Sequence, residues 1–335
     1  MRIQSMNTHC FACTEQRPLT VEHVIPQAIG GKLKARLYCK TCNEVLGEIL
    51  DKEISKQFGW ICTLLNIKLE RSKAQPYEVK DIKSGTKLLF DGINLKRKNP
   101  VVKVGSKDGQ KLDYADVTAR SEQELKRICT SIECRYDLPG GMETFQDVRP
   151  GPTDAERVIV IDNSLLRRAV SKIAYSFICT KLPASVIFSS AFEPIRQYIR
   201  ASEGSALACA NFLDTGFMKD DVRPIHKIHV ALNRNHGLLV GYVSLFGIYR
   251  FTVLLAEDFK SEIEWPDLDY TFDPVRRSRV VGNDNFRATP LTKENILHPR
   301  QSKSLVQIEL DKGHKVIERY VKDFRFLHGE LEGDS

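Results

Sequence analysis

The chain has 335 residues, 42% of them hydrophobic, and a formal net charge of +7 at pH 7. This length favours two domains with enough apolar residues for buried cores. The sequence has no apolar run of about 18 residues and no signal-peptide pattern at its start, so neither a membrane-spanning nor an exported protein is expected. Nine cysteines in such a chain favour a reducing compartment, and we predict a cytoplasmic protein.

Four of the cysteines stand in two C-x-x-C pairs. Cys10 and Cys13 form the first pair, and Cys39 and Cys42 form the second after an interval of 25 residues. Each pair sits on a tight turn that directs two thiolates to one point, and two such turns complete a tetrahedral site of four sulfur atoms. The spacing therefore predicts a structural zinc ion, with free buried thiols as the alternative.

The residues between and after the pairs predict a short hairpin followed by a helix. A strand is expected over Leu19–Ile25, where β-branched residues precede a proline, and it carries Glu22 beside His23. A second strand is expected at Leu37-Tyr38, and a helix is expected from Asn43 to about Phe58. Because Asn43 directly follows the last cysteine, the second cysteine turn fixes where its amide points.

The combined pattern of C-x-x-C, E-H-V-I-P, G-G and C-x-x-C-N resembles the HNH endonuclease family, in particular its zinc-stapled ββα-metal nucleases. The resemblance covers roughly residues 8–56. It implies that His23 is the general base and that Glu22 and Asn43 hold one catalytic divalent cation, Mg²⁺ or Mn²⁺. The implied products are a 5′-phosphate and a 3′-hydroxyl. Many family members have Asp or His where this chain has Glu22, and the longer side chain bears on the position of the ion and on the preferred metal.

Other residues near the motif allow more than one interpretation. Asp51 either orients a metal ligand or is a surface carboxylate. Gly47 either lets the hairpin or DNA approach closely or is an ordinary packing glycine. His9 is expected to be a loop residue rather than a ligand. His226 and His229 are three apart on a predicted strand and point to opposite faces, so we expect core or surface histidines rather than a shared metal.

A local excess of positive charge predicts contact with a phosphate backbone. Residues 61–111 hold 12 Lys and Arg against 5 Asp and Glu, so the rest of the chain nearly balances. Basic residues beside a nuclease motif fit DNA as the partner, although a solvated charged face is the alternative. The residues expected to contact nucleic acid are Lys32, Lys34, Arg36, Lys40, Lys96, Arg97 and Lys98.

We predict an α+β protein: a ββα-metal nuclease domain with structural zinc over residues 1–60, a linker over 61–75, and a larger α+β domain with an antiparallel sheet over 76–335. The last region is expected to supply specificity, partner binding or regulation. Its expected elements are a hairpin over 77–90, strands over 101–104 and 158–161, helices over 121–136, 163–182 and 192–201, a loop over 139–152, meander strands over 225–232, 238–246 and 249–256, and a strand or helix over 307–327.

Three functions are compatible with these patterns. The leading one is a metal-dependent HNH endonuclease that acts on DNA, with restriction or phage defence as the context suggested by family analogy. The second is a non-catalytic zinc-containing protein that binds nucleic acid, and the third is a nuclease that acts on RNA or branched DNA. A homodimer or a partner protein bound through the C-terminal region is compatible with each of them.

Overall fold

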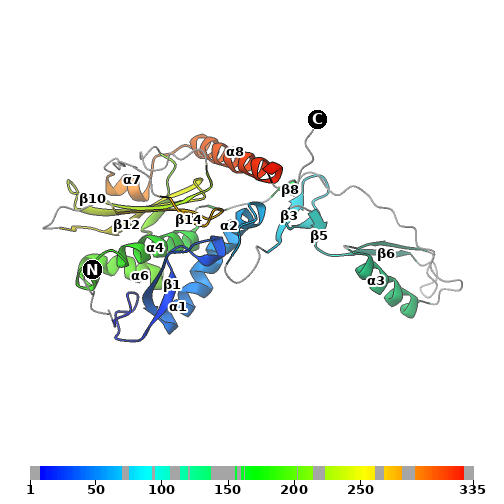
Figure 1. Cartoon of the computed structure of the whole chain (residues 1–335), viewed down its shortest axis with the longest axis horizontal. Coiled ribbons are helices and arrows are strands. Elements are labelled where there is room, and N and C mark those ends of the chain that lie inside the picture. The colour runs from blue at the N-terminus through cyan, green and yellow to red at the C-terminus, as the bar shows by residue number, and fades with distance from the viewer. Residues whose placement is uncertain are drawn as a thin grey trace. The chain divides into compact units, whose positions relative to one another are not determined.

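A computed structural model describes residues 8–69, 75–92, 95–105, 114–119, 121–136, 155–156, 160–161, 163–201, 203–213, 223–260, 268–280 and 291–327 (Figure 1). The chain divides into two compact units, one formed by Met1–Ala74 with Val160–Ser335 and the other by Gln75–Ile159. Both units contain helices and antiparallel strands, which confirms the predicted α+β class. Within the described residues, no helix is both long and apolar enough to cross a membrane.

The division into units differs from the predicted one over 1–60, 61–75 and 76–335. The first unit joins the N-terminal segment to residues beyond 160, because a helix from the later part of the chain packs on the N-terminal helix. The sheet of the later part also contacts this segment, through the ring of Tyr249 on that of Phe58 and through His226, which lies 2.9 Å from the Ile29 carbonyl oxygen. The second unit comprises 75–159, which lies between these two parts in the sequence. Sequence spacing gave no sign of this pairing of distant segments.

The N-terminal segment is a hairpin followed by a helix, as predicted. Strand β1 (Leu19–His23) pairs antiparallel with β2 (Lys34–Cys39), and a short turn, η1 (Gln27–Ile29), lies between them. The helix begins at α1 (Lys40–Leu46), widens by one π-type turn, η2 (Gly47–Asp51), and continues as α2 (Lys52–Leu64). It ends beyond the predicted Phe58 because the apolar spacing continues through the buried Ile61 and Cys62.

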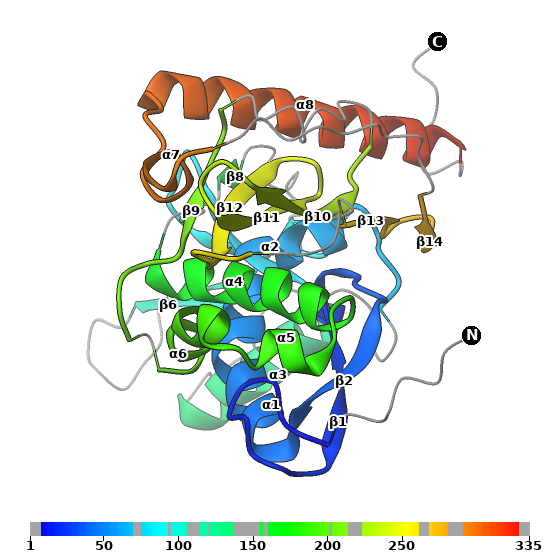
Figure 2. The same cartoon turned by 90° about the vertical axis from the view of Figure 1, so that its left-hand side faces the viewer.

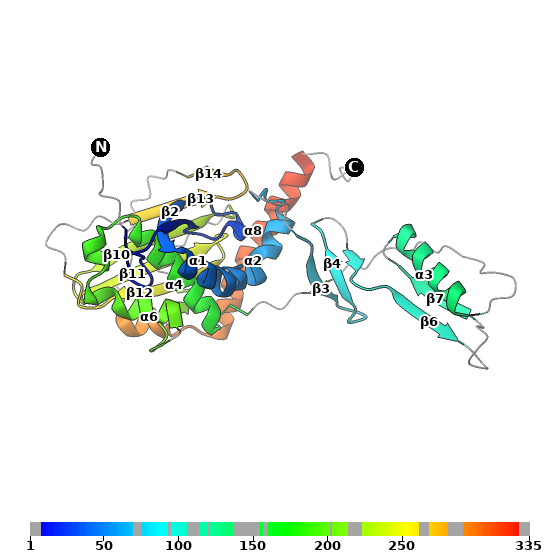
Figure 3. The same cartoon turned by 90° about the horizontal axis from the view of Figure 1, so that it is seen from below.

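The centre of the first unit is a six-stranded antiparallel sheet with strand order β14-β13-β10-β11-β12-β9. The predicted meander is confirmed, and every residue of its last two strands is buried, as expected for strands covered on both faces. Figures 2 and 3 show the arrangement of the helices around this sheet, with α8 over one face and α4 over the other. The strands are β9 (Ala208–Ala210), β10 (His226–Asn233), β11 (Leu238–Leu245), β12 (Tyr249–Ala256), β13 (Leu268–Asp273) and β14 (Ser278–Arg279).

Helix α4 (Ser164–Cys179) is the element that joins the sheet to the N-terminal segment. It begins as predicted, with the Asn163 side chain accepting a hydrogen bond from the Leu166 amide at 2.8 Å. The sequence predicts one apolar stripe, but residues 168–179 are buried all around the helix. Its polar face is therefore buried against the hairpin rather than exposed to solvent.

The remaining helices of the first unit cover the edges and the outer face of the sheet. Helix α8 confirms the helix alternative predicted over 307–327 but starts earlier, and its His314 lies 3.1 Å from the hydroxyl of Tyr249 in β12. These helices are α5 (Ala184–Ile187), α6 (Glu193–Ala201), α7 (Lys293–Leu297) and α8 (Lys303–Leu327), with a short turn, η3 (Ser190–Phe192), before α6.

The second unit contains two small sheets and one helix. The predicted hairpin and the helix capped by Ser121 are confirmed, whereas the predicted loop over 139–152 lies outside the described residues. Of the strand predicted over 158–161, the first two residues lie outside the described part of the chain, and Val160 and Ile161 are not in a strand. Its strands have the orders β5-β4-β3-β8 and β6-β7. The elements are β3 (Tyr77–Asp81), β4 (Lys87–Phe90), β5 (Leu95–Arg97), β6 (Val101–Gly105), β7 (Tyr114–Thr118), α3 (Glu122–Arg135) and β8 (Ala155–Glu156).

Candidate functional site

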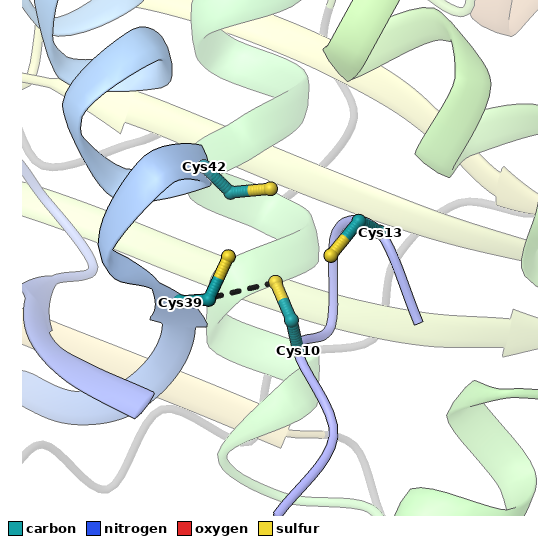
Figure 4. Close-up of side chains that lie close together, drawn as sticks. All are labelled: Cys10, Cys13, Cys39 and Cys42. Atoms are coloured by element: carbon teal, nitrogen blue, oxygen red, sulfur yellow. Dashed lines mark hydrogen bonds between the residues drawn. The ribbon is translucent and has the colours of Figure 1, made fainter. Parts of the chain in front are cut away.

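The four predicted cysteine ligands converge on one point (Figure 4). The Sγ atoms of Cys10, Cys13, Cys39 and Cys42 all lie within 4.8 Å of one another. A zinc ion with bonds of about 2.3 Å to sulfur holds its four ligands about 3.8 Å apart in a tetrahedron. Among the residues that the structure describes, this is the one group of three or more His, Cys, Asp or Glu ligand atoms so close together. The cluster therefore fits a structural zinc ion.

Two local turns bring the thiols together. The first turn is closed by the Thr14 amide, which donates to the Cys10 carbonyl at 2.8 Å. The second lies where β2 ends at Cys39 and the first turn of α1 carries Cys42. The two turns touch directly, since the Cys39 amide donates to Cys10 Sγ at 3.3 Å. A hydrogen bond with Cys42 also lowers the pKa of the Cys10 thiol to about 4. These contacts favour a thiolate at the centre of the cluster.

Glu22 and His23 form the end of β1 and differ in exposure. Val21 is 50% exposed, Glu22 is 6% exposed, and His23 is half-buried. This alternation follows from strand geometry, which directs neighbouring side chains to opposite faces. Glu22 thus points inward toward α4, and His23 lies at the edge of the hairpin opposite Lys34.

Asn43 ties the first turn of α1 to β1. Its amide nitrogen donates to the Thr20 hydroxyl at 3.0 Å and to the Val21 carbonyl at 3.3 Å. Thr20 in turn donates to the Tyr38 carbonyl at 2.9 Å, so the helix is held to both strands of the hairpin. Both bonds of Asn43 use its nitrogen, which leaves its amide oxygen as the atom it could offer to a cation.

A residue that the sequence did not single out completes this region. Lys172, from the middle of α4, places its Nζ atom 2.5 Å from Glu22 Oε1 and 2.7 Å from Asp51 Oδ1. The second oxygen of Asp51 accepts from the same ammonium at 2.8 Å. The Lys172 side chain is only 2% exposed and that of Asp51 is 26% exposed. Asp51 is therefore neither a plain surface carboxylate nor an isolated one, because it shares a buried cation with Glu22.

Opposing effects set the ionisation of these carboxyl groups. Burial is the larger effect and raises the pKa of Glu22 and of Asp51 above their ordinary values, while the adjacent Lys172 ammonium opposes this rise in both. The neighbouring charges also matter. The charge of Asp51 raises the pKa of Glu22, and a charged His23 lowers the pKa of Asp51. Glu22, His23, Asp51 and Lys172 thus form one electrostatically connected group.

The predicted nucleic-acid contacts fall into two sets. In the first unit, Lys34, Arg36 and Lys40 are exposed along β2 and the start of α1, and Lys32 is partly exposed just before them. In the second unit, Lys96, Arg97 and Lys98 lie on or next to β5. Two of the latter pair with acidic residues, Lys96 with Asp91 at 3.2 Å and Lys98 with Glu78 at 2.5 Å.

Gly31, in the G-G pair of the motif, and Gly47, in the helix, have different surroundings. A Cβ atom on Gly31 would lie 1.9 Å from the Ile25 carbonyl oxygen, so the loop after β1 requires glycine there. A Cβ atom on Gly47 would have only Asp51 Oδ2 within 4 Å, at 3.9 Å, so this glycine leaves open space on the side of Asp51.

The histidines outside the hairpin take structural places. His9 is exposed and its ring lies against Phe188, with ring centroids 6.1 Å apart. His226 and His229 are buried in the sheet on β10, and His226 Nε2 lies 2.9 Å from the carbonyl oxygen of Ile29.

Comparison with known proteins identifies the N-terminal segment alone. Residues 9–59 match the family model described as HNH endonuclease. The matched segment contains both cysteine turns, the hairpin with Glu22 and His23, and the helix with Asn43 and Asp51. Lys172 lies outside it. No curated protein and no solved structure matches the chain.

Proposed function

We propose that this chain, whose residues 9–59 form a domain of the HNH endonuclease family, is a metal-dependent endonuclease that hydrolyses phosphodiester bonds in DNA. The observation that carries the proposal is the cluster of four thiols that fixes β2 and α1 beside β1. This arrangement gathers an acidic residue, a histidine and an amide at one edge of a rigid hairpin–helix unit. Hydrolysis of a phosphodiester requires such groups to activate water and to stabilise the charge on phosphate.

His23 is the proposed general base. An imidazole changes protonation near neutral pH and can accept a proton from the attacking water. The Nε2 atom of His23 is buried, so we assign the proton transfer to Nδ1. Asp51 lies close enough for its charge to interact with that of His23, and it would stabilise the imidazolium that forms.

The group around Glu22 provides oxygen atoms suited to a hard divalent cation. Three carboxylate oxygens of Glu22 and Asp51 surround the Lys172 ammonium at 2.5–2.8 Å, and this contact with a positive charge supports the proposal. Glu22, with Asp51 or with the amide oxygen of Asn43, would therefore hold Mg²⁺ or Mn²⁺. When bound, the cation supplies stabilisation of the departing 3′ oxygen, which is consistent with 5′-phosphate and 3′-hydroxyl products.

The exposed basic residues of β2 and α1 would orient the DNA backbone. Lys34 and Arg36 lie two residues apart and so share one side of the strand, and Lys40 continues the series at the start of α1. The second unit, with Lys96, Arg97 and Lys98, is proposed to add specificity or partner binding. Restriction or phage defence is the context that we propose by analogy with the family.

One observation favours a second candidate, a non-catalytic zinc protein that binds nucleic acid. The Lys172 ammonium already occupies the position between the carboxylates that a divalent cation needs. In that case the protein should retard DNA in a gel without cleaving it in Mg²⁺ or Mn²⁺.

A plasmid assay distinguishes the two functions. Purified wild type with Mg²⁺ or Mn²⁺ should convert supercoiled plasmid to the nicked or linear form, and His23→Ala should lose at least about 100-fold in rate. His236→Ala, a change in the exposed turn after β10, is the matched control and should cleave like the wild type. Equal nicking by His23→Ala and the wild type would attribute the activity to a contaminant. Linear duplex, four-way junction and RNA substrates then identify the preferred nucleic acid.

A further inference from the structure

Lys172 reaches the candidate active site from a distant part of the chain. It lies 121 residues after Asp51 and on α4, outside the segment that matches the HNH family. Its ammonium contacts three carboxylate oxygens of Glu22 and Asp51. The geometry is that of a cation held by oxygen ligands, with an ammonium in the place of a metal ion.

The position of Lys172 is fixed by packing on the next turn of α4. The Tyr175 hydroxyl donates to the Phe11 carbonyl at 2.8 Å, and the Ser176 hydroxyl lies 2.6 Å from that of Tyr38. All four of these residues are buried or nearly so. The helix is therefore attached to the first cysteine turn and to β2, and the lysine is delivered to the carboxylates by a rigid element.

Another buried cation on the same helix shows what a purely structural role looks like. Arg168, one turn earlier, donates to the carbonyl oxygens of Tyr198, Ile199 and Arg200 at 2.8–3.1 Å. These partners are neutral. Lys172 instead meets two ionisable carboxyl groups, so Glu22, Asp51 and Lys172 together carry one more negative than positive charge when all three are ionised. A buried excess of negative charge is costly and attracts a further cation.

We propose that Lys172 occupies the cation position between Glu22 and Asp51 when no divalent metal is bound, and that it competes with the metal for these carboxylates. This inference rests on the proposed function, because it concerns the same site. Lys172 acts through its two partners and is a positioning residue. The competition sets the affinity of the site, since the divalent cation must displace an ammonium that the fold holds in place.

The test is a calorimetric titration of Mn²⁺ into the full-length, zinc-loaded protein. Lys172→Met removes the charge and keeps most of the side-chain length. It should raise Mn²⁺ affinity about tenfold or more, because the competing ammonium and its repulsion of the metal ion are both removed. Arg168→Met is the matched control on the same helix. It should lower the melting temperature and leave Mn²⁺ affinity unchanged. Mn²⁺ affinity in folded Lys172→Met that is no higher than in the wild type would overturn the inference.

A second variant decides the question if Lys172→Met does not fold. Asp51→Asn leaves Lys172 with Glu22 as a balanced pair and should weaken Mn²⁺ binding at least about tenfold, whereas unchanged affinity would overturn the inference. Plasmid cleavage separates this result from the proposed function. Cleavage by the wild type without a change of affinity in Lys172→Met refutes the competition alone. Tighter Mn²⁺ binding by Lys172→Met, with no cleavage by either protein, supports the competition and refutes the nuclease.

Discussion

His226 connects the sheet to the loop of the N-terminal hairpin, and its protonation should destabilise the first unit. The residue is fully buried at the start of β10. The Phe246 amide donates to its Nδ1 atom at 3.4 Å, so the proton of the neutral ring is on Nε2, which donates to the Ile29 carbonyl at 2.9 Å. Both ring nitrogens are thus used by the neutral form. Burial lowers the pKa of His226 to about 4, although the bond to Ile29 partly opposes this effect.

The size and direction of the effect follow from the pKa of His226 in the folded and in the unfolded protein. An unfolded chain titrates histidine near 6.5 and the folded protein titrates His226 near 4, so between these values the unfolded state binds more protons. The stabilising contribution is therefore complete above pH 6.5 and is lost as the pH falls toward 4. At about 1.4 kcal/mol per pH unit, the loss amounts to about 3 kcal/mol. Burial also lowers the pKa of His229 to about 4, which adds a loss of the same sign over the same range.

Urea unfolding at several pH values between 4 and 7 measures the loss. His226→Gln cannot titrate but retains an amide that can donate to the Ile29 carbonyl. On acidification the wild type should lose about 3 kcal/mol more of its free energy of unfolding than this variant. His236→Gln, in the exposed turn after β10, should follow the wild type. Parallel pH curves for the wild type and His226→Gln would refute the reasoning.

Two further predictions concern the N-terminal segment. Cys39→Ser should release zinc and unfold this segment, as metal analysis and circular dichroism would show. Cys134→Ser, a change at an exposed cysteine of α3, is the control and should keep its full zinc content. Zinc retained by Cys39→Ser would disprove the four-thiol site. Gly31→Ala should cost at least about 2 kcal/mol of unfolding free energy because its Cβ would lie 1.9 Å from the Ile25 carbonyl oxygen. Gly47→Ala has a helical backbone, and outside that backbone its Cβ would have only Asp51 Oδ2 nearby, at 3.9 Å. It should instead stabilise the protein by up to about 1 kcal/mol, and equal effects of the two changes would contradict the geometry.

The elements of the candidate site that depend on nearby residues were predictable. Both cysteine turns, the strand with Glu22 and His23 and the helix after Cys39 follow from short-range spacing, and the structure contains each of them. The helix capped by Asn163 and the meander after residue 225 follow from the same kind of signal. Their boundaries differ by a few residues in both directions, since α4 ends at Cys179 instead of residue 182 and β1 at His23 instead of Ile25, because apolar spacing does not specify the hydrogen bonds at the end of an element.

Lys172 was not predictable in the same way. A lysine in an amphipathic helix is normally solvated, and nothing in the residues around it indicates a buried partner. Its role depends on the opposite face of α4 being covered by the hairpin and on Glu22 pointing inward. The hydrogen bonds of Asn43 to Thr20 and Val21 likewise depend on how the helix lies across the strand.

The sequence by itself determined the cysteine cluster, the hairpin–helix unit and the residues that resemble a nuclease site, because each of these depends on turns and periodicities within about 50 residues. Only the tertiary structure decided that the beginning and the end of the chain form one unit and that a lysine from α4 shares the carboxylates of the site. The physical reason is that the burial of a polar side chain is set by the surface that packs against it, and that surface comes from a distant part of the chain.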